Sequence, residues 1–324
     1  MIRSFVYSDG KPVGKDLETE ALRLVRADKG LVLWVDLENP TAEETKTILD
    51  GVFAFHPLAI EDCEAPNSLP KVEDYEEYLF IVTHAVDFSR TEKFNTTELD
   101  LFLGHDFIVT YHASALRSVS TLVERTLKSA GPGPRGPDRI AHALLDLIVD
   151  NYVPVVDELR DELEEIEEHV LSRESGQQTM VNELLHVRAD FTKLRAIVRP
   201  QREVIERLAR GDSRLIRPKL LPYFRDLRDN LVRLEEMAAS YHERLLMAFE
   251  IYLNRAAFEA NQGIKFLTAL TAVTLPVVCV GSWYGMNFQH MPELRSPYGY
   301  MIASTFTLIS TLVMVFWLKR KHWF

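Results

Sequence analysis

Two uncharged stretches near the end of the chain decide its fold. Residues 266–292 read FLTALTAVTLPVVCVGSWYGMNFQHMP, and residues 296–318 read SPYGYMIASTFTLISTLVMVFWL. Each is at least as long as the roughly 20 residues that a helix needs to cross the hydrocarbon core of a bilayer. Glu293 and Arg295 are the only charged residues between them, so the connection is short. The sequence therefore predicts two membrane-spanning helices joined by a short loop.

The ends of the chain set the orientation of these helices. The second stretch is followed by Lys319, Arg320 and Lys321, and the positive-inside rule places such a cluster in the cytoplasm. Residues 1–10 lack the apolar segment of a signal peptide. We expect a multi-pass protein of the plasma membrane (the inner membrane of a bacterium), with both termini cytoplasmic. The basic cluster is also suited to binding anionic membrane lipid.

A single long helix is expected to lead into the first span. No Gly or Pro interrupts the chain between Tyr223 and Asn261, and apolar residues recur there at steps of three and four. They are Leu227, Leu231, Leu234, Ala238, Tyr241, Leu245, Phe249, Tyr252 and Ala256. A helix over residues 219–284 would be about 100 Å long at 1.5 Å per residue. Because one helix cannot bury such a stripe alone, we expect it to pack against copies of itself.

The chain before this helix divides at a Gly- and Pro-rich segment, residues 131–137. Apolar runs at 31–37, 78–83, 99–103 and 107–111 predict strands, with a hairpin turn at His105-Asp106, and helical stretches lie between them. Thr41 and Glu44 have the spacing of a capping box. Residues 1–130 are therefore expected to form an α+β (α/β) cytoplasmic domain. After the boundary we expect one helix over 138–173 and a second ending near Arg210.

The expected organisation follows from these boundaries. It comprises a cytoplasmic domain (1–130), a cytoplasmic helical pair (138–217), a stalk helix continuing into the first transmembrane helix (219–284), an extracytoplasmic loop (285–297), a second transmembrane helix (298–318) and a basic cytoplasmic tail (319–324).

Composition excludes several classes of function. The net charge of −11 argues against a nucleic-acid partner, since phosphate binding needs a basic surface. The two cysteines, Cys63 and Cys279, cannot form a disulfide framework. The sequence contains no P-loop, no Gly-x-Ser-x-Gly and no His-Glu-x-x-His. We therefore expect neither an enzyme nor an organic cofactor.

The connection between the two spans carries a recognisable motif. It reads Tyr284-Gly285-Met286-Asn287-Phe288, followed by Met291-Pro292-Glu293-Leu294. This resembles the signature loop of the CorA magnesium transporter family. Further similarity lies at His56 to Asp62, Pro70 to Glu73, Pro222 to Asp226, and at Asn261, Lys265, Leu267 and Thr268. The resemblance implies a homopentamer whose first spans line a central pore, with Mg²⁺ as the main substrate and Co²⁺ and in some members Ni²⁺ carried as well.

The resemblance assigns ion selection to the loop residues Tyr284, Gly285, Met286, Asn287 and Glu293. Mg²⁺ sheds its water reluctantly. A ring of five Asn287 amide oxygens would accept hydrogen bonds from the waters around the ion without holding the ion too tightly to release it. Gly285 would permit the tight turn at the helix end, and Tyr284 would brace the loop. Taken without its motif, Asn287 would be interpreted as an ordinary helix C-cap.

One face of the first span is identified by the resemblance as the pore lining. Its members recur at steps of three or four: Asn261, Ile264, Leu267, Thr271, Leu275, Val278 and Ser282. Leu267 and Leu275 would form hydrophobic constrictions, and Asn261 a second amide ring at the inner mouth. On periodicity alone, the leucines also fit plain helix packing. Family members often have Thr at the position of Val278 and Gly at that of Ser282.

Four acidic residues match regulatory positions of the family. Asp62 and Asp226, with Glu61 adjacent and Glu250 further along the stalk, would hold cytoplasmic Mg²⁺ between neighbouring subunits. Carboxylates from two chains repel each other until a cation bridges them, so bound Mg²⁺ would keep the channel closed. Mg²⁺ would thus be both substrate and regulator. The acid-rich run at 157–168 is interpreted as a solvated helix face rather than a site.

The sequence therefore predicts a divalent-cation uptake channel that selects hydrated cations at the Gly-Met-Asn loop and is closed by cytoplasmic Mg²⁺. Two alternatives stay open. One is a zinc transporter of the same superfamily, although the Met-Pro-Glu-Leu segment favours the magnesium branch. The other is a membrane-anchored sensor whose spans are only anchors.

Overall fold

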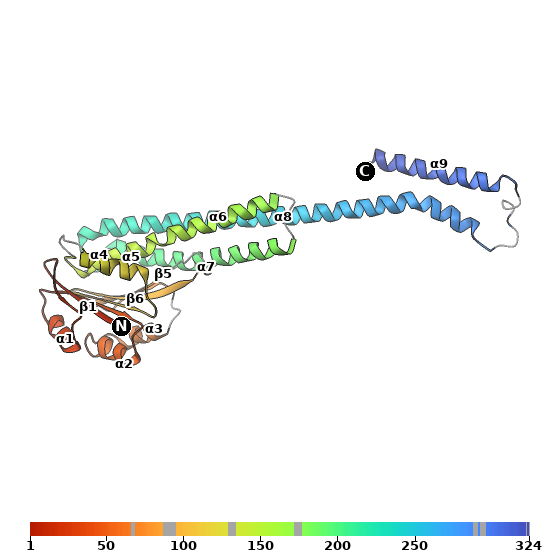
Figure 1. Cartoon of the computed structure of the whole chain (residues 1–324). Coiled ribbons are helices and arrows are strands. Elements are labelled where there is room, and N and C mark those ends of the chain that lie inside the picture. Colours follow the sequence, from red (N-terminus) through yellow and green to blue (C-terminus); the bar gives the residue numbers. More distant parts are fainter. Residues whose placement is uncertain are drawn as a thin grey trace. The chain divides into compact units, whose positions relative to one another are not determined.

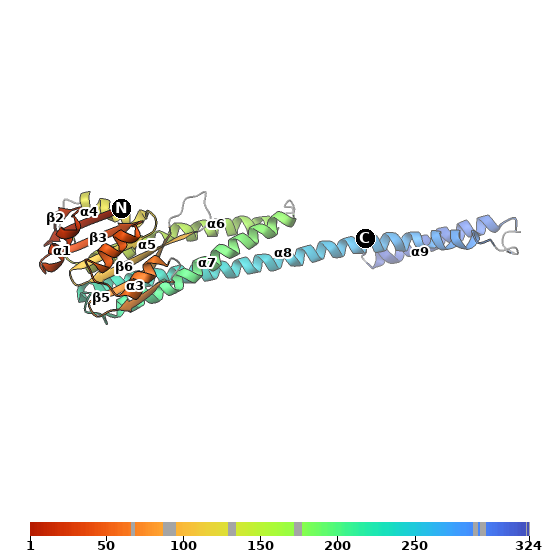
Figure 2. The same cartoon turned by 90° about the horizontal axis from the view of Figure 1, so that it is seen from below.

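The computed structural model describes residues 1–65, 69–86, 95–128, 134–171, 177–287, 291, 296–321 and 323, with the side chains of 177–179 excepted. The chain forms two compact units, Met1–Leu246 and Met247–Phe324. The first contains a mixed sheet with helices on both faces, and the second contains the end of helix α8 together with helix α9 (Figures 1 and 2). The predicted class, an α+β domain followed by a long helix and a C-terminal helix, is confirmed.

Seven strands form one sheet in the order β2-β1-β3-β7-β6-β5-β4. Only β3 and β7 pair in parallel among the described strands. The strands are β1 (Ile2–Ser8), β2 (Lys11–Lys15), β3 (Val32–Glu38), β4 (Lys71–Asp74), β5 (Tyr78–Val86), β6 (Thr96–Gly104) and β7 (Phe107–His112). The four predicted strands correspond to β3, β5, β6 and β7, and the turn at His105-Asp106 joins β6 to β7. Sequence reasoning missed β1, β2 and the edge strand β4.

One face of the sheet is covered by α1 (Thr19–Ala27), α2 (Ala42–Thr45) and α3 (Pro57–Glu64) (Figure 1). The capping box is confirmed, because Glu44 N–H donates to Thr41 Oγ1 at 3.2 Å and Thr41 N–H donates to Glu44 Oε2 at 2.8 Å. The chain then continues as a π-helical turn, Lys46–Asp50. Helix α3 starts after His56, whose Nδ1 accepts from the N–H of Leu58 at 3.2 Å. This start sets the register that places Asp62 beside β4.

The opposite face carries α4 (Arg117–Lys128), α5 (Pro137–Asp150), α6 (Tyr152–Leu171) and α7 (Gln177–Arg210) (Figure 1). Buried Tyr152 ties this layer to the sheet by donating to the carbonyl of His84 at 2.8 Å. The expected single helix over 138–173 is wrong, since α5 and α6 are separate helices that meet at Asn151. Pro154 explains the break, because proline lacks an N–H and is tolerated only in the first turn of a helix.

Helix α8 (Leu221–Tyr284) is continuous over 64 residues and passes through Pro276. Its apolar stripe is buried within the first unit at Leu227, Leu231, Leu234, Ala238 and Leu245. Contacts to the neighbouring helices hold it there: Arg202 of α7 lies 2.7 Å from Glu235, and Arg244 lies 2.6 Å from Glu167 of α6. One subunit therefore buries this part of the stripe itself, and the expectation that the stripe requires copies of the chain is wrong for these residues.

In the second unit, the last part of α8 lies beside α9 (Gly299–Arg320) (Figures 1 and 2). The helix over Pro218–Tyr284 and α9 are both long and apolar enough to cross a membrane. Ala269 of α8 is fully buried, whereas most large apolar side chains on both helices are exposed. In water this exposure would be costly, so the second unit has the surface of a membrane-embedded helix pair.

Candidate functional site

The predicted selectivity loop begins where α8 ends. The helix stops at Tyr284, and the N–H of Gly285 donates to the carbonyl of Gly281 at 3.0 Å. A Cβ atom at position 285 would lie 3.1 Å from that carbonyl oxygen, which is tighter than most real contacts, so glycine suits this helix end. Asn287 follows in an exposed, non-helical position. Its amide can therefore contact a hydrated ion without leaving a packed environment.

The other predicted loop residues differ in burial, and one of them is not described by the structure. Tyr284 is half-buried and Met286 is exposed. Glu293 falls within 292–295, which, like 288–290, lies outside the described residues. Its role stays a prediction.

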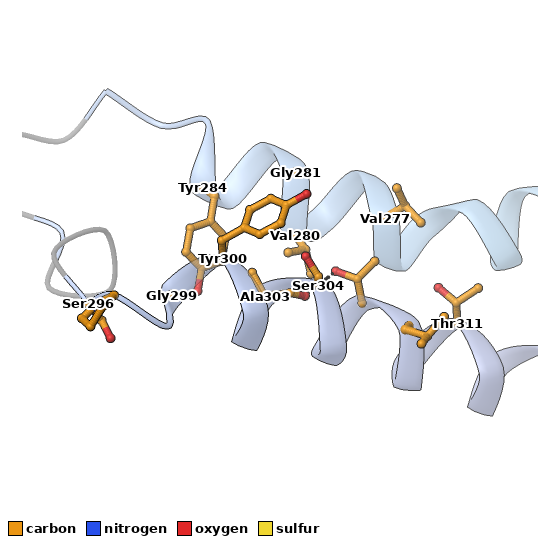
Figure 3. Close-up of a pocket in the computed structure, with 13 residues that line it drawn as sticks. Val277, Val280, Gly281, Tyr284, Ser296, Gly299, Tyr300, Ala303, Ser304 and Thr311 are labelled. Carbon is orange, nitrogen blue, oxygen red and sulfur yellow. Dashed lines mark hydrogen bonds between the residues drawn. The ribbon is translucent and has the colours of Figure 1, made fainter.

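A groove separates α8 from α9 directly beside the start of the loop (Figure 3). Its volume is about 760 Å³, and Tyr284 of α8 and Tyr300 of α9 are among its lining residues. Small residues on both helices, including Gly281, Gly299 and Ala303, line it as well. Small residues let membrane helices approach closely. Tyr284 thus faces α9 at the end of the span, and its role in bracing the loop stays a prediction.

The seven residues of the predicted pore face are all exposed in the single subunit: Asn261, Ile264, Leu267, Thr271, Leu275, Val278 and Ser282. Ala269, the buried residue of this segment, lies on the other side of the helix. At about 100° per residue, Leu267, Leu275 and Val278 are roughly 120–180° away from Ala269 around the axis. The face predicted to line the pore is therefore not the face that meets α9. The hydroxyl of Thr271 donates back to the carbonyl of Leu267 at 2.9 Å, so its oxygen remains an acceptor.

The predicted regulatory residue Asp62 is already ion-paired within its own subunit. Its Oδ2 lies 2.6 Å from Nζ of Lys71, which also lies 2.9 Å from Oε1 of Glu73. Partial burial opposes the charge on Lys71, but the hydrogen bonds to Asp62 and Glu73 outweigh this and raise its pKa. Lys71 is therefore a permanent cation beside Asp62. The sequence motif included Lys71, but nothing local indicated which residue it pairs with.

Asp226 lies in acidic surroundings that the sequence did not reveal. It is exposed on the first turns of α8. Burial, then the charge of Asp150, and to a smaller extent the charge of Asp226, raise the pKa of Asp146 on α5. Three carboxylates from α5 and α8 thus repel one another near the predicted site. Glu61 and Glu250 are exposed, and within the described residues no hydrogen bond or ion pair joins Asp62 to Asp226 in one subunit.

A second acidic group, Asp36, Glu38 and His112, has side-chain ligand atoms within 4.8 Å of one another. Its lone pairs are already used, however. Oδ2 of buried Asp36 accepts two hydrogen bonds from Arg3, at 3.0 and 2.6 Å, and Oδ1 accepts from Thr110 at 2.5 Å and lies 3.2 Å from His112. Burial raises the pKa of Asp36, but hydrogen bonds from His112 and Thr110 and the charge of Arg3 lower it overall. This network ties β1 to β3 and β7, and its guanidinium would repel a metal ion.

The acid-rich run at 157–168 lies on α6 and has the character of a solvated face. Arg160 pairs with Asp157 at 3.0 Å and with Asp161 at 2.9 Å. The apolar positions Leu159 and Leu163 are buried, as the periodicity predicts.

Comparison with known proteins places this geometry in a family. The sequence model of the CorA-like Mg²⁺ transporter protein family matches residues 29–320. YfjQ of Bacillus subtilis is 33% identical over 291 residues, covering 90% of this chain and 89% of that protein. The cobalt/magnesium transport protein CorA of Thermotoga maritima is 26% identical over 298 residues, covering 91% and 84%. The structure of the CorA magnesium transporter from Methanocaldococcus jannaschii has a TM-score of 0.80 at 21% identity and covers 99% of this chain and 98% of its own, so it shares the fold. The chain belongs to the CorA-like Mg²⁺ transporter family.

Proposed function

We propose that the chain is the subunit of a channel that admits Mg²⁺, and also Co²⁺, across the plasma membrane into the cytoplasm. The observation that carries this proposal is the exposed Gly-Met-Asn segment at the end of α8, a helix long and apolar enough to cross the membrane. Selection would occur there, with Asn287 amides contacting the waters of a hydrated ion and Tyr284, Gly285, Met286 and Glu293 shaping the loop.

The conduction path follows the uncovered face of α8. Ile264, Leu267, Leu275 and Val278 are between 51 and 63% exposed in one subunit. If copies of the chain surround an axis on this side, Leu267 and Leu275 form apolar rings that close by dewetting, and Asn261 forms the inner amide ring.

The orientation follows from the last turn of α9. Lys319 and Arg320 end that helix, and Nζ of Lys321 lies 5.2 Å from the ring of Trp317. An aromatic ring beside lysines is typical of the membrane interface, and the basic cluster favours the cytoplasmic side and anionic lipid headgroups. Both termini are then cytoplasmic.

Regulation is proposed to occur between subunits of the cytoplasmic part. Asp62, Glu61, Asp226 and Glu250 are carboxylates with which neighbouring chains would bind Mg²⁺ when its cytoplasmic concentration is high. Because carboxylates contributed by two chains repel one another, a cation that bridges them would stabilise the closed arrangement relative to the open one.

The channel is predicted to be a homopentamer. Since the stripe of α8 is buried within one subunit up to Leu245, we expect the copies to meet further along the helix, where apolar residues such as Leu253 and Phe258 are 50% and 62% exposed. Native mass spectrometry in mild detergent is expected to show five copies. A stable monomer or dimer under these conditions would contradict the assembly and the central pore with it.

Ion flux into liposomes tests the function itself. Purified protein is expected to admit Mg²⁺ and Co²⁺, with Zn²⁺ entering more slowly, because the Met-Pro-Glu-Leu segment favours the magnesium branch of the superfamily. Flux of Zn²⁺ alone would favour the zinc-transporting alternative. Absence of flux, together with tolerance of a scrambled loop around Asn287 in cells, would favour the membrane-anchored sensor.

A further inference from the structure

Lys71 lies between two carboxylates at the edge of the sheet. Its Nζ is 2.6 Å from Oδ2 of Asp62 on α3 and 2.9 Å from Oε1 of Glu73, two residues along β4. All three side chains are partly exposed, at 29–40%. The ammonium is thus accessible to solvent ions and is shared by one proposed metal ligand and one residue without a proposed function.

Several contacts fix this arrangement. Side chains alternate along a strand, so Lys71 and Glu73 lie on the same face of β4, and Val72 between them points to the other face. The carbonyl of Val72 accepts a hydrogen bond from Arg207 of α7 at 2.8 Å, which holds the edge strand in place. Tyr75 donates to Oε2 of Glu73 at 2.9 Å, which leaves Oε1 for Lys71. The second carboxylate therefore already shares the ammonium and can keep it when Asp62 binds a cation.

We propose that Lys71 is a built-in competitor of the regulatory cation and sets the Mg²⁺ concentration at which the channel closes. This inference rests on the proposed role of Asp62. Within the described residues, the only hydrogen bond of the Asp62 side chain is the one from Lys71. A divalent ion that binds Asp62 must displace this ammonium or lie next to its positive charge. Glu73 accepts the displaced ammonium, so the exchange leaves no unpaired charge.

The competition predicts effects of opposite sign for two neighbouring substitutions. Lys71→Gln removes the competitor, so half-maximal closure is expected at a Mg²⁺ concentration about two- to five-fold lower, the range expected for a partly exposed ion pair. Glu73→Gln keeps an acceptor oxygen but removes the second negative charge, so the ammonium pairs more strongly with Asp62 and closure is expected to require about two- to five-fold more Mg²⁺. If Lys71 and Glu73 had only a structural role, both substitutions would change the Mg²⁺ concentration for half-maximal closure in the same direction.

The test uses the full-length channel in liposomes, with Co²⁺ influx measured at varied internal Mg²⁺. Lys15→Gln is the matched control, because Lys15 forms an exposed ion pair with Asp16, 3.4 Å away, and the change removes the same charge from the same domain. It is expected to leave the midpoint unchanged. Limited proteolysis at varied Mg²⁺ supplies a second readout that does not depend on conduction.

Asp62→Asn in the same assay separates this inference from the proposed function. Opposite shifts for Lys71→Gln and Glu73→Gln support the competition. Suppose that Asp62→Asn weakens closure by Mg²⁺, while Lys71→Gln and Glu73→Gln change the Mg²⁺ concentration for half-maximal closure in the same direction or not at all. The competition by Lys71 is then overturned, and the regulatory role of Asp62 is kept. If Asp62→Asn keeps the wild-type response, Asp62 is not a regulatory ligand, and both ideas fail.

Discussion

Replacing Asn287 with alanine is expected to abolish Mg²⁺ uptake while leaving assembly intact. Each amide in a five-fold ring contributes about 1 kcal/mol through a hydrogen bond to the waters of the ion. Loss of all five is then about 5 kcal/mol, or more than a thousand-fold in occupancy of the ion site. The loss would appear as an absence of Mg²⁺ entry into liposomes containing the purified variant.

The position of Asn287 makes this experiment specific. The residue is exposed beyond the last turn of α8, so truncating its side chain removes no packing. Ser296→Ala is the matched control, since Ser296 is also a small, exposed polar residue in the described part of the same connection. It is expected to keep its flux. Near wild-type flux in Asn287→Ala would instead show that the loop is not the entrance filter and would favour the anchor alternative.

The long helices could be predicted from the sequence, because the patterns that indicate them are continuous stretches of neighbouring residues. The uninterrupted pattern before Tyr284 correctly predicts one continuous α8, and the uncharged run before Lys319 predicts α9. The same pattern could not tell what buries the stripe: the helices α6 and α7 do so, and their approach to α8 is a tertiary feature. Strand β2 (Lys11–Lys15) was missed because it is short, largely exposed and contains both Pro and Gly.

The candidate sites divide in the same way. Asn287 and its helix end are neighbours in sequence, so a motif was enough to find them. The pairing of Lys71 with Asp62 joins an edge strand to a helix, and the network around Asp36 joins three strands. No residue spacing encodes such contacts, because they depend on how the sheet is ordered. The charge environment of Asp226 likewise depends on α5 packing near the start of α8.

The double substitution Asp62→Asn, Asp226→Asn is expected to remove closure by cytoplasmic Mg²⁺. Both changes keep size and polarity but remove the charge that attracts the cation. A regulatory site that half-fills near millimolar Mg²⁺ binds with about 4 kcal/mol. Five such sites acting together can supply the roughly 5.5 kcal/mol that moves a channel from mostly open to mostly closed. Without them, the open arrangement should persist at internal Mg²⁺ concentrations that close the wild type.

Two measurements check this result: Co²⁺ influx at varied internal Mg²⁺, and protection from proteolysis by Mg²⁺. Both responses should be lost in the double variant, while native mass spectrometry still shows the wild-type assembly. Asp229→Asn serves as the control, because Asp229 is an exposed acid one turn further along α8 that pairs with Arg228 at 2.7 Å. It should respond as the wild type does. If the double variant also keeps the wild-type response, then Asp62 and Asp226 are not the sensor, and the carboxylates Asp146 and Asp150 on α5 become the residues to replace, since their repulsion would remain for a cation to relieve.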